Sequence, residues 1–180
     1  MEIITEHLIL REFLFNDSPA VLAYHQDHIY LEFYPLSTQT RSDTKEFVQW
    51  YLDEQTESPR NRVQLAVVLK ETSELIGNAC VHRKPENDWE ADLDFEIAPE
   101  HWRQGYATEA TAALIEYGFN EMKLHRISAS CIAENRASTR VLLKLGTREE
   151  GRLRENKFFK GRWWDTRIFG ILKDEWAGPA

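Results

Sequence analysis

The sequence predicts a domain of the α/β class (α+β in the wider sense) in which helices flank a mixed central β-sheet. Its 180 residues suit one domain that buries most of its apolar surface. Segments in which apolar and polar side chains alternate are interspersed with segments of helical periodicity. We see no internal repeat, low-complexity tract or linker. We therefore expect one domain over residues 1–180, with the element order β-α-α-β-β-β-α-β-α-β-β.

The first strand and the first helix are predicted from local patterns near the start of the chain. Residues 7–13 alternate apolar and polar side chains, as a half-buried strand does. The stretch NDSPAVLAYHQ (residues 16–26) predicts a helix, because Asp17 or Ser18 can cap it and Pro19 fits its first turn.

A second helix and a hairpin follow. Residues 42–55 have helical periodicity, and Asp43 and Glu46 are placed like a capping box. Two runs rich in β-forming residues, 63–69 and 75–82, are separated by the sequence KETSE and predict a β-hairpin.

The second half of the chain alternates strands and helices. A turn is predicted at 85–89 and a strand at 91–98, before a loop and a helix that begins at about Thr108. Gly146 is typical of a helix end. The remaining predicted elements are a strand over 126–133, a helix over 135–145, and two strands near 148–158 and 163–172 around a turn at Lys160-Gly161.

Composition limits the classes of partner. The chain has 22 Lys and Arg against 30 Asp and Glu, a net charge of -8, which argues against nucleic acid and favours cationic ligands. Cys80 and Cys131 form no CxxC pair and no metal spacing, which indicates a reducing compartment. No secretory signal and no apolar run long enough to span a membrane are visible, so we expect a cytoplasmic protein with no membrane partner.

The loop before the helix at Thr108 is a candidate anion site. A helix start leaves backbone N–H groups unpaired and partly positive, and small residues before it let a phosphate approach them. Gln104-Gly105-Tyr106-Ala107 could therefore cradle a pyrophosphate. The alternative is a turn that simply needs glycine. Neither a Walker loop nor the three-glycine dinucleotide fingerprint is present.

Three carboxylates lie on one face of the strand predicted at 91–98. Alternation places Asp92, Asp94 and Glu96 together, opposite an apolar face. They could bind an ammonium group, and Glu96 or Asp94 could remove its proton, directly or through water. The alternative is a solvated edge strand, and a bulge would change which carboxylate points where.

Other candidates carry weaker signals. Most aromatic residues are expected to belong to the core, but Tyr34 and Trp89 could line an acceptor groove. His25 and His28 share a helix face, and no carboxylate or cysteine completes a metal set. We expect that face to be solvated and the protein to use no metal. Asn135 is expected to cap the helix 135–145.

The loop sequence PEHWRQGYATEA resembles the acetyl-CoA loop of the GNAT N-acetyltransferases, in which a hexapeptide wraps the pyrophosphate. The segments TEHLILREF, AENRASTRVLLKLG and EGRLRENKFFKGRWWDT are similar in order and spacing to the RimJ/RimL-like branch, so the resemblance covers nearly the whole chain. The expected fold is then a single GNAT-like domain, and the order of predicted elements is similar to the GNAT order.

The resemblance implies a set of acetyl-CoA contacts. The backbone of Glu96 and Ile97 is expected to pair with the pantetheine arm like an added strand, and Asn135 to bond it. Ser138 is expected beside the sulfur, where it could protonate the leaving thiolate. The pyrophosphate is expected to lie on the loop residues Trp102, Arg103, Gln104, Gly105, Tyr106, Ala107 and Thr108.

Three positions depart from the family pattern. Trp102 replaces the usual polar residue at the start of the hexapeptide, His7 stands where an arginine is expected, and Asp94 stands where glycine is frequent. The first puts one polar contact to the cofactor in doubt, although the backbone amides are expected to do most of the binding.

The function that follows is transfer of an acetyl group from acetyl-CoA to a primary amine, without a metal. We expect the acceptor to be a protein or peptide N-terminal α-amine, with Asp92, Tyr34 and Trp89 near it. Alternatives are a small amine (a polyamine, an aminoglycoside or an amino acid) and a non-catalytic acyl-CoA-binding module. The acceptor loops near 28–41 and 84–90 have no readable code, and the protein could be a monomer or a homodimer.

Overall fold

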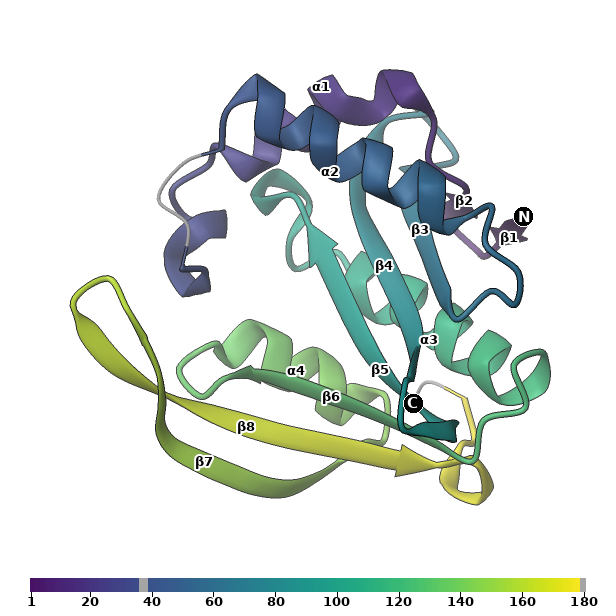
Figure 1. The fold of residues 1–180 in the computed structure, drawn as a ribbon, viewed down its shortest axis with the longest axis vertical. Helices are drawn as coiled ribbons and strands as arrows, with labels where there is room; N and C mark the ends of the chain where they lie inside the picture. Colours follow the sequence, from purple (N-terminus) through teal and green to yellow (C-terminus); the bar gives the residue numbers. More distant parts are fainter. Residues whose placement is uncertain (36–38, 179–180) are drawn as a thin grey trace.

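An eight-stranded sheet with helices on both faces runs through the protein; the structure is a computed structural model that describes residues 1–35 and 39–178 (Figure 1). The strands are β1 (Glu2–Ile4), β2 (Leu8–Arg11), β3 (Arg62–Leu69), β4 (Leu75–Lys84), β5 (Asn87–Ile97), β6 (Arg126–Ile132), β7 (Arg148–Phe159) and β8 (Arg162–Leu172). The helices are α1 (Ser18–His25), α2 (Arg41–Glu54), α3 (Tyr106–Asn120) and α4 (Arg136–Lys144), with short 3-10 turns η1 (Phe15–Asp17), η2 (Tyr30–Phe33), η3 (Pro99–His101) and η4 (Lys173–Glu175).

The sheet is mixed because one of its strand pairs is parallel. The strand order is β1-β2-β3-β4-β5-β6-β8-β7, and every neighbouring pair except β5 and β6 is antiparallel. The parallel pair comprises only three residue pairs and ends at Asp92 and Ser128. Beyond that point the two strands diverge, as Figure 1 shows. The predicted fold class and element order are confirmed, and β1 is an additional strand that alternation did not reveal.

Two apolar cores lie on opposite faces of the sheet. One core joins α3 and α4 to the sheet, and the other joins α1 and α2 to it. Strand β3 contributes to both cores: Leu65 and Val67 belong to the first, whereas Ala66 and Val68 belong to the second. Burial on both faces explains why the sequence of this strand is an almost continuous apolar run.

Two helix starts differ from the prediction. Helix α2 begins at Arg41, and its capping box joins Thr40 and Asp43, whose backbone N–H groups each donate to the other's side chain. The predicted box of Asp43 and Glu46 is wrong, since it assumed a later start. Asp17 occupies the N-cap position of α1, as one of the two predicted caps, but its carboxylate accepts from the backbone N–H of Leu14 and not from the helix.

The later elements lie close to their predicted bounds. Strand β5 begins at Asn87, so most of the turn predicted at 85–89 belongs to the strand. Asn135 caps α4 by accepting from the backbone N–H of Ser138 at 3.0 Å, as predicted. Gly146 has a φ of +77° just after that helix, also as expected. Among the described residues, no helix has both the length and the apolar character needed to cross a membrane.

Gly77 determines how closely β4 approaches β5. A Cβ at this position would lie 2.0 Å from the backbone oxygen of Glu96, so the strands would have to move apart. We expect Gly77→Ala to lower the free energy of unfolding by about 2 kcal/mol or more, in the range of overpacked cores. Gly151→Ala is the matched control, because a Cβ there meets nothing within 4 Å. Denaturant unfolding checks both variants, and equal stabilities would contradict the argument.

Candidate active site

A cavity of about 730 Å³ opens where β5 and β6 separate. Its lining comes from β5, β6, the start of α4, helix α2 and the β7–β8 hairpin. Residues 93–97 of β5 have no partner strand on the β6 side, so backbone groups on that edge are free for an extended ligand. This is the edge on which Glu96 and Ile97 were expected to pair with pantetheine.

The loop before α3 presents a row of free amides. Arg103 and Gly105 both have left-handed backbone conformations, with φ of +65° and +92°. None of the six N–H groups from Arg103 to Thr108 donates to any described residue. Successive free amides at a helix start form a concave anion site. The geometry therefore suits the predicted phosphate contacts of Gln104, Tyr106 and Ala107, which are main-chain contacts.

Trp102 ties this loop to the end of β5. Its indole Nε1–H donates to the backbone oxygen of Ile97 at 2.6 Å. The residue that departs from the family pattern thus holds the anion loop beside the free strand edge. The same contact occupies one lone pair of the Ile97 carbonyl, leaving one for a ligand.

Asn135 and Ser138 line the cavity from the α4 side, whereas Glu96 and Asp94 line it from β5. The structure therefore brings together the residues predicted to act on the two sides of the reaction. The predicted acceptor residue Tyr34 also lines the cavity. Part of the predicted acceptor loop, residues 36–38, lies outside the described residues.

The three carboxylates of β5 have different surroundings. Asp92 accepts from the Ser128 hydroxyl at 2.6 Å and lies 3.4 Å from Lys84 Nζ, and it is not part of the cavity lining. Asp94 is 63% exposed. Glu96 is only 16% exposed and lies in a network of side chains. Of the three, Glu96 is the carboxylate that the protein surrounds and orients.

The network around Glu96 includes residues that the sequence analysis missed. Asn78 Nδ2 donates to Glu96 Oε2 at 2.7 Å, and Gln64 Nε2 donates to Asn78 Oδ1 at 2.7 Å. His25 Nε2 lies 3.1 Å from the same Glu96 oxygen. The expectation that His25 belongs to a solvated face is wrong, since it is 2% exposed, whereas His28 is exposed. The sequence does contain a signal for these two side-chain amides, because Gln64 and Asn78 interrupt otherwise apolar strands.

Four tyrosines surround the carboxylate. Burial raises the pKa of Tyr24, Tyr30, Tyr34 and Tyr51, and the negative charge of Glu96 raises each of these pKa values further. The four hydroxyls are therefore neutral at physiological pH. A cationic amine that approaches Glu96 meets an anionic carboxylate among neutral aromatic side chains, which favours its capture, whereas Arg62 and Lys157 are the cations elsewhere in the lining.

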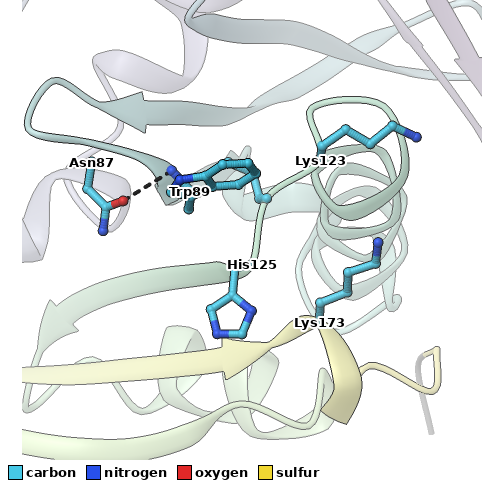
Figure 2. A pocket seen from close by; sticks show the side chains of 6 residues that line it. Asn87, Trp89, Lys123, His125 and Lys173 are labelled. Carbon is cyan, nitrogen blue, oxygen red and sulfur yellow. Dashed lines mark hydrogen bonds between the residues drawn. The ribbon is translucent and has the colours of Figure 1, made fainter.

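The structure does not bring Trp89 to this cavity. It is 65% exposed and lies near the other end of β5, seven residues before Glu96. Figure 2 shows it beside Asn87 and His125 in a separate, open pocket of about 530 Å³, with Lys123 and Lys173 opposite. Alternation could not reveal this, because it assigns a face of the strand but not a position relative to the point where β5 and β6 separate.

One cluster near the cavity has the residue types of a metal site. The ligand atoms of Cys80, His82 and Asp94 lie within 4.8 Å of one another, a proximity that sequence spacing did not indicate. Arg62 Nη1, however, lies 3.1 Å from Cys80 Sγ. Burial raises the pKa of the Cys80 thiol to about 12, so the thiol is protonated. A protonated thiol beside a guanidinium group is a poor ligand, and we assign no metal to the cluster.

Comparison with known proteins identifies relatives of the whole chain. The family model described as an acetyltransferase (GNAT) domain matches residues 7–148. The uncharacterized N-acetyltransferase YnaD of Bacillus subtilis is 36% identical, over 98% of this chain and 99% of that protein.

Two solved structures with bound coenzyme share the fold at low identity. RimL, a ribosomal L7/L12 α-N-protein acetyltransferase in complex with coenzyme A, has a TM-score of 0.84 at 18% identity, covering 97% of this chain and 99% of that one. The spermidine N-acetyltransferase of Vibrio cholerae, in complex with CoA and spermine, has a TM-score of 0.80 at 21% identity, covering 94% and 97%.

The free amides before α3 predict a phosphate-binding loop that tolerates no side chain at Gly105. The left-handed φ of this residue is strained for a β-branched side chain, and the Cβ would project into open space beside the amides. We expect Gly105→Val to weaken CoA binding at least tenfold, as measured by calorimetry.

Gly161→Val is the matched control for this test. Gly161 also has a left-handed φ, of +75°, and open surroundings, but it lies in the β7–β8 turn. It is expected to carry similar backbone strain and to leave CoA affinity unchanged. Unchanged affinity in Gly105→Val would remove the loop from the binding site.

Proposed function

Since this chain belongs to the GNAT acetyltransferase family and is an acetyl-CoA-dependent enzyme that acetylates amines, we propose that its acceptor is the N-terminal α-amine of a protein or peptide. The family assignment makes the chain an enzyme rather than the non-catalytic module that its sequence left open. The observation that carries the proposal is the placement of Glu96, an oriented and mostly buried carboxylate that lines the cavity.

The acidity of the amine decides which acceptor suits this carboxylate. Only a neutral amine attacks a thioester, and the α-amine pKa lies near 7.7–8.0, against about 10.4 for lysine. At pH 7 roughly a tenth of α-amines are neutral, against well under one in a thousand lysines. Glu96 and Asp94 attract the ammonium form but oppose its deprotonation, so an acceptor of low pKa suffers least from this conflict.

In the proposed mechanism each wall of the cavity has its own role. Acetyl-CoA supplies an activated acetyl thioester. Glu96 accepts the proton of the amine, and a backbone N–H on the free edge of β5 stabilises the oxyanion. Ser138, on the opposite wall, protonates the leaving sulfur. The amides of Arg103 to Thr108 hold the pyrophosphate, and Asn135 bonds the pantetheine arm.

A small cationic amine is the second candidate. The cavity lining includes Glu96 and Asp94 together with aromatic side chains such as Trp50 and Phe158, which suits a polyamine as well as a peptide end. The fold neighbours include enzymes named for each kind of acceptor, so the acceptor has to be tested directly.

A competition assay tests the acceptor class. We expect a short peptide with a free N-terminus to be acetylated at least tenfold faster at pH 7 than the same peptide N-blocked and carrying an internal lysine, because far more of its amine is neutral. Mass spectrometry of the products measures both rates. Spermidine, added as a third acceptor, tests the second candidate. A lysine peptide that reacts as fast, or spermidine that reacts faster, would refute the α-amine proposal.

The role proposed for Ser138 predicts a defect in turnover. We expect Ser138→Ala to lower kcat by roughly 10- to 100-fold, the lower part of the range for a lost proton donor, because a thiolate leaves readily. The KM for acetyl-CoA should change little. Ser130→Ala is the control, since Ser130 lines the same cavity from β6. If kcat is unchanged when the chemical step limits the rate, Ser138 serves only to begin α4.

A further inference from the structure

The two oxygens of the Glu96 carboxylate differ in their surroundings. Oε2 accepts from Asn78 Nδ2 at 2.7 Å and lies 3.1 Å from His25 Nε2. No hydrogen bond within 3.5 Å joins Oε1 to a described residue; the hydroxyls of Tyr24 and Tyr34 interact with the carboxylate only more weakly, and Glu96 lines the cavity. One oxygen is thus held by the protein, while the other is free for a ligand.

Asn78 is fixed in an orientation that can only donate to Glu96. Its Oδ1 accepts from Gln64 Nε2 at 2.7 Å, and its Nδ2 also donates to the Tyr24 hydroxyl at 3.1 Å. The reverse orientation would direct the amide oxygen at a carboxylate, with repulsion between two acceptors. One lone pair of Glu96 Oε2 is therefore permanently used.

The imidazole of His25 is held on every side. It stacks on Tyr30 at 5.1 Å between centroids and meets the edge of Tyr24 at 4.7 Å. Its Nδ1 lies 2.7 Å from Gln39 Oε1, an acceptor, so a neutral ring with its proton on Nε2 requires the Gln39 amide to turn and donate its Nε2–H to Nδ1. The ring is fully buried, so it cannot swing away and its Nε2 remains directed at the carboxylate. A proton on Nε2 makes this contact a hydrogen bond, whereas a bare Nε2 would face the ionised carboxylate with its lone pair.

We propose that His25 is a positioning residue for Glu96: its Nε2–H donates to Oε2, and together with Asn78 it leaves Oε1 as the atom that takes the proton of the acceptor amine. This inference rests on the proposed role of Glu96 as the base. In the step, an N–H bond of the ammonium breaks and an O–H bond forms at Oε1. The electron pair stays on nitrogen for attack on the thioester, and His25 keeps its proton.

On α1, η2 and α2, the described ionisable groups nearest to Glu96 and His25 are tyrosines. Tyr24 of α1, Tyr30 of η2, Tyr34 after η2 and Tyr51 of α2 are neutral, because burial and the Glu96 charge raise their pKa values. Asp94 is the ionisable neighbour on β5 itself, and it is mostly exposed. The described cations that line the same cavity are Arg62 of β3 and Lys157 of β7, and Glu96 is the anionic group there that Asn78 and His25 orient.

The position of the proton can be measured without any acceptor. A long-range proton–nitrogen NMR spectrum of protein labelled with ¹⁵N-histidine shows which ring nitrogens carry protons, and the loss of signals in His25→Gln assigns this residue. We expect Nε2 of His25 to be protonated at pH 7 and its shift to change in Glu96→Gln. An unprotonated Nε2 would overturn the proposal, whichever amine the enzyme acetylates.

Kinetics test the consequence for catalysis. His25→Phe keeps an aromatic ring but removes the donor, whereas His25→Gln retains an amide N–H that can reach Oε2. With the free-N-terminus peptide at pH 7, we expect kcat/KM to fall roughly 100-fold in His25→Phe and by less than about tenfold in His25→Gln. The KM for acetyl-CoA should be unchanged in both. His125→Gln is the control, because His125 is exposed and lies in the separate pocket beside Trp89.

The pH dependence separates positioning of a base from a merely structural role. At pH 9 about nine-tenths of the α-amine is already neutral and needs no base. The defect of His25→Phe should therefore shrink to below about tenfold there. A defect of equal size at pH 7 and pH 9, or no rescue by His25→Gln when its melting temperature matches that of the wild type, would overturn the inference. A wild-type enzyme that ignores the peptide would instead refute the proposed acceptor, and the NMR result would then decide the role of His25.

Discussion

The separation of β5 from β6 after three residue pairs is the constraint on which the rest of the site depends. A continuous sheet would use every backbone group along both strands, and no ligand could add to it. The divergence leaves an unpaired edge on β5 and a cavity beside it. It also places the start of α3 after the end of β5 and the start of α4 after the end of β6. The start of α4 lines the cavity through Asn135 and Ser138, whereas the loop before α3 is tied to the end of the β5 edge through Trp102.

The elements could be predicted because each depends on local chemistry. Alternation, Gly146 after α4 and Asn135 before it fix strand and helix positions through contacts a few residues apart. The shape of the loop before α3 could be predicted for the same reason, since a left-handed Gly105 and a helix start are local features. The prediction was wrong where several neighbouring residues are able to cap the same helix. Thr40 caps α2, whereas the predicted cap, Asp43, lies inside the helix.

The acid–base part of the site could not be predicted from local patterns. His25 lies 71 positions from Glu96 in sequence, and only the packing of α1 over the sheet brings the two together. Alternation identified three carboxylates on one face of β5, but it could not rank them. The ranking comes from Asn78 on the neighbouring strand and from the distance of each residue to the point of divergence. The same limitation explains why Trp89, on the same strand, lies in another pocket.

A hydrogen-bonded polar network lies under the cavity. Gln64 and Asn78 are almost fully buried in strands that otherwise contribute apolar side chains, and burying such groups costs free energy unless each is hydrogen-bonded. Here each amide is bonded, and the series of donors ends at a carboxylate that is partly open to the cavity. A leucine at position 78 would remove the donor to Glu96 Oε2 and would leave the Gln64 amide and the Tyr24 hydroxyl without this partner. The buried amides therefore hold one oxygen of the Glu96 carboxylate, a role that core packing does not explain, and in the proposed mechanism the other oxygen faces the acceptor.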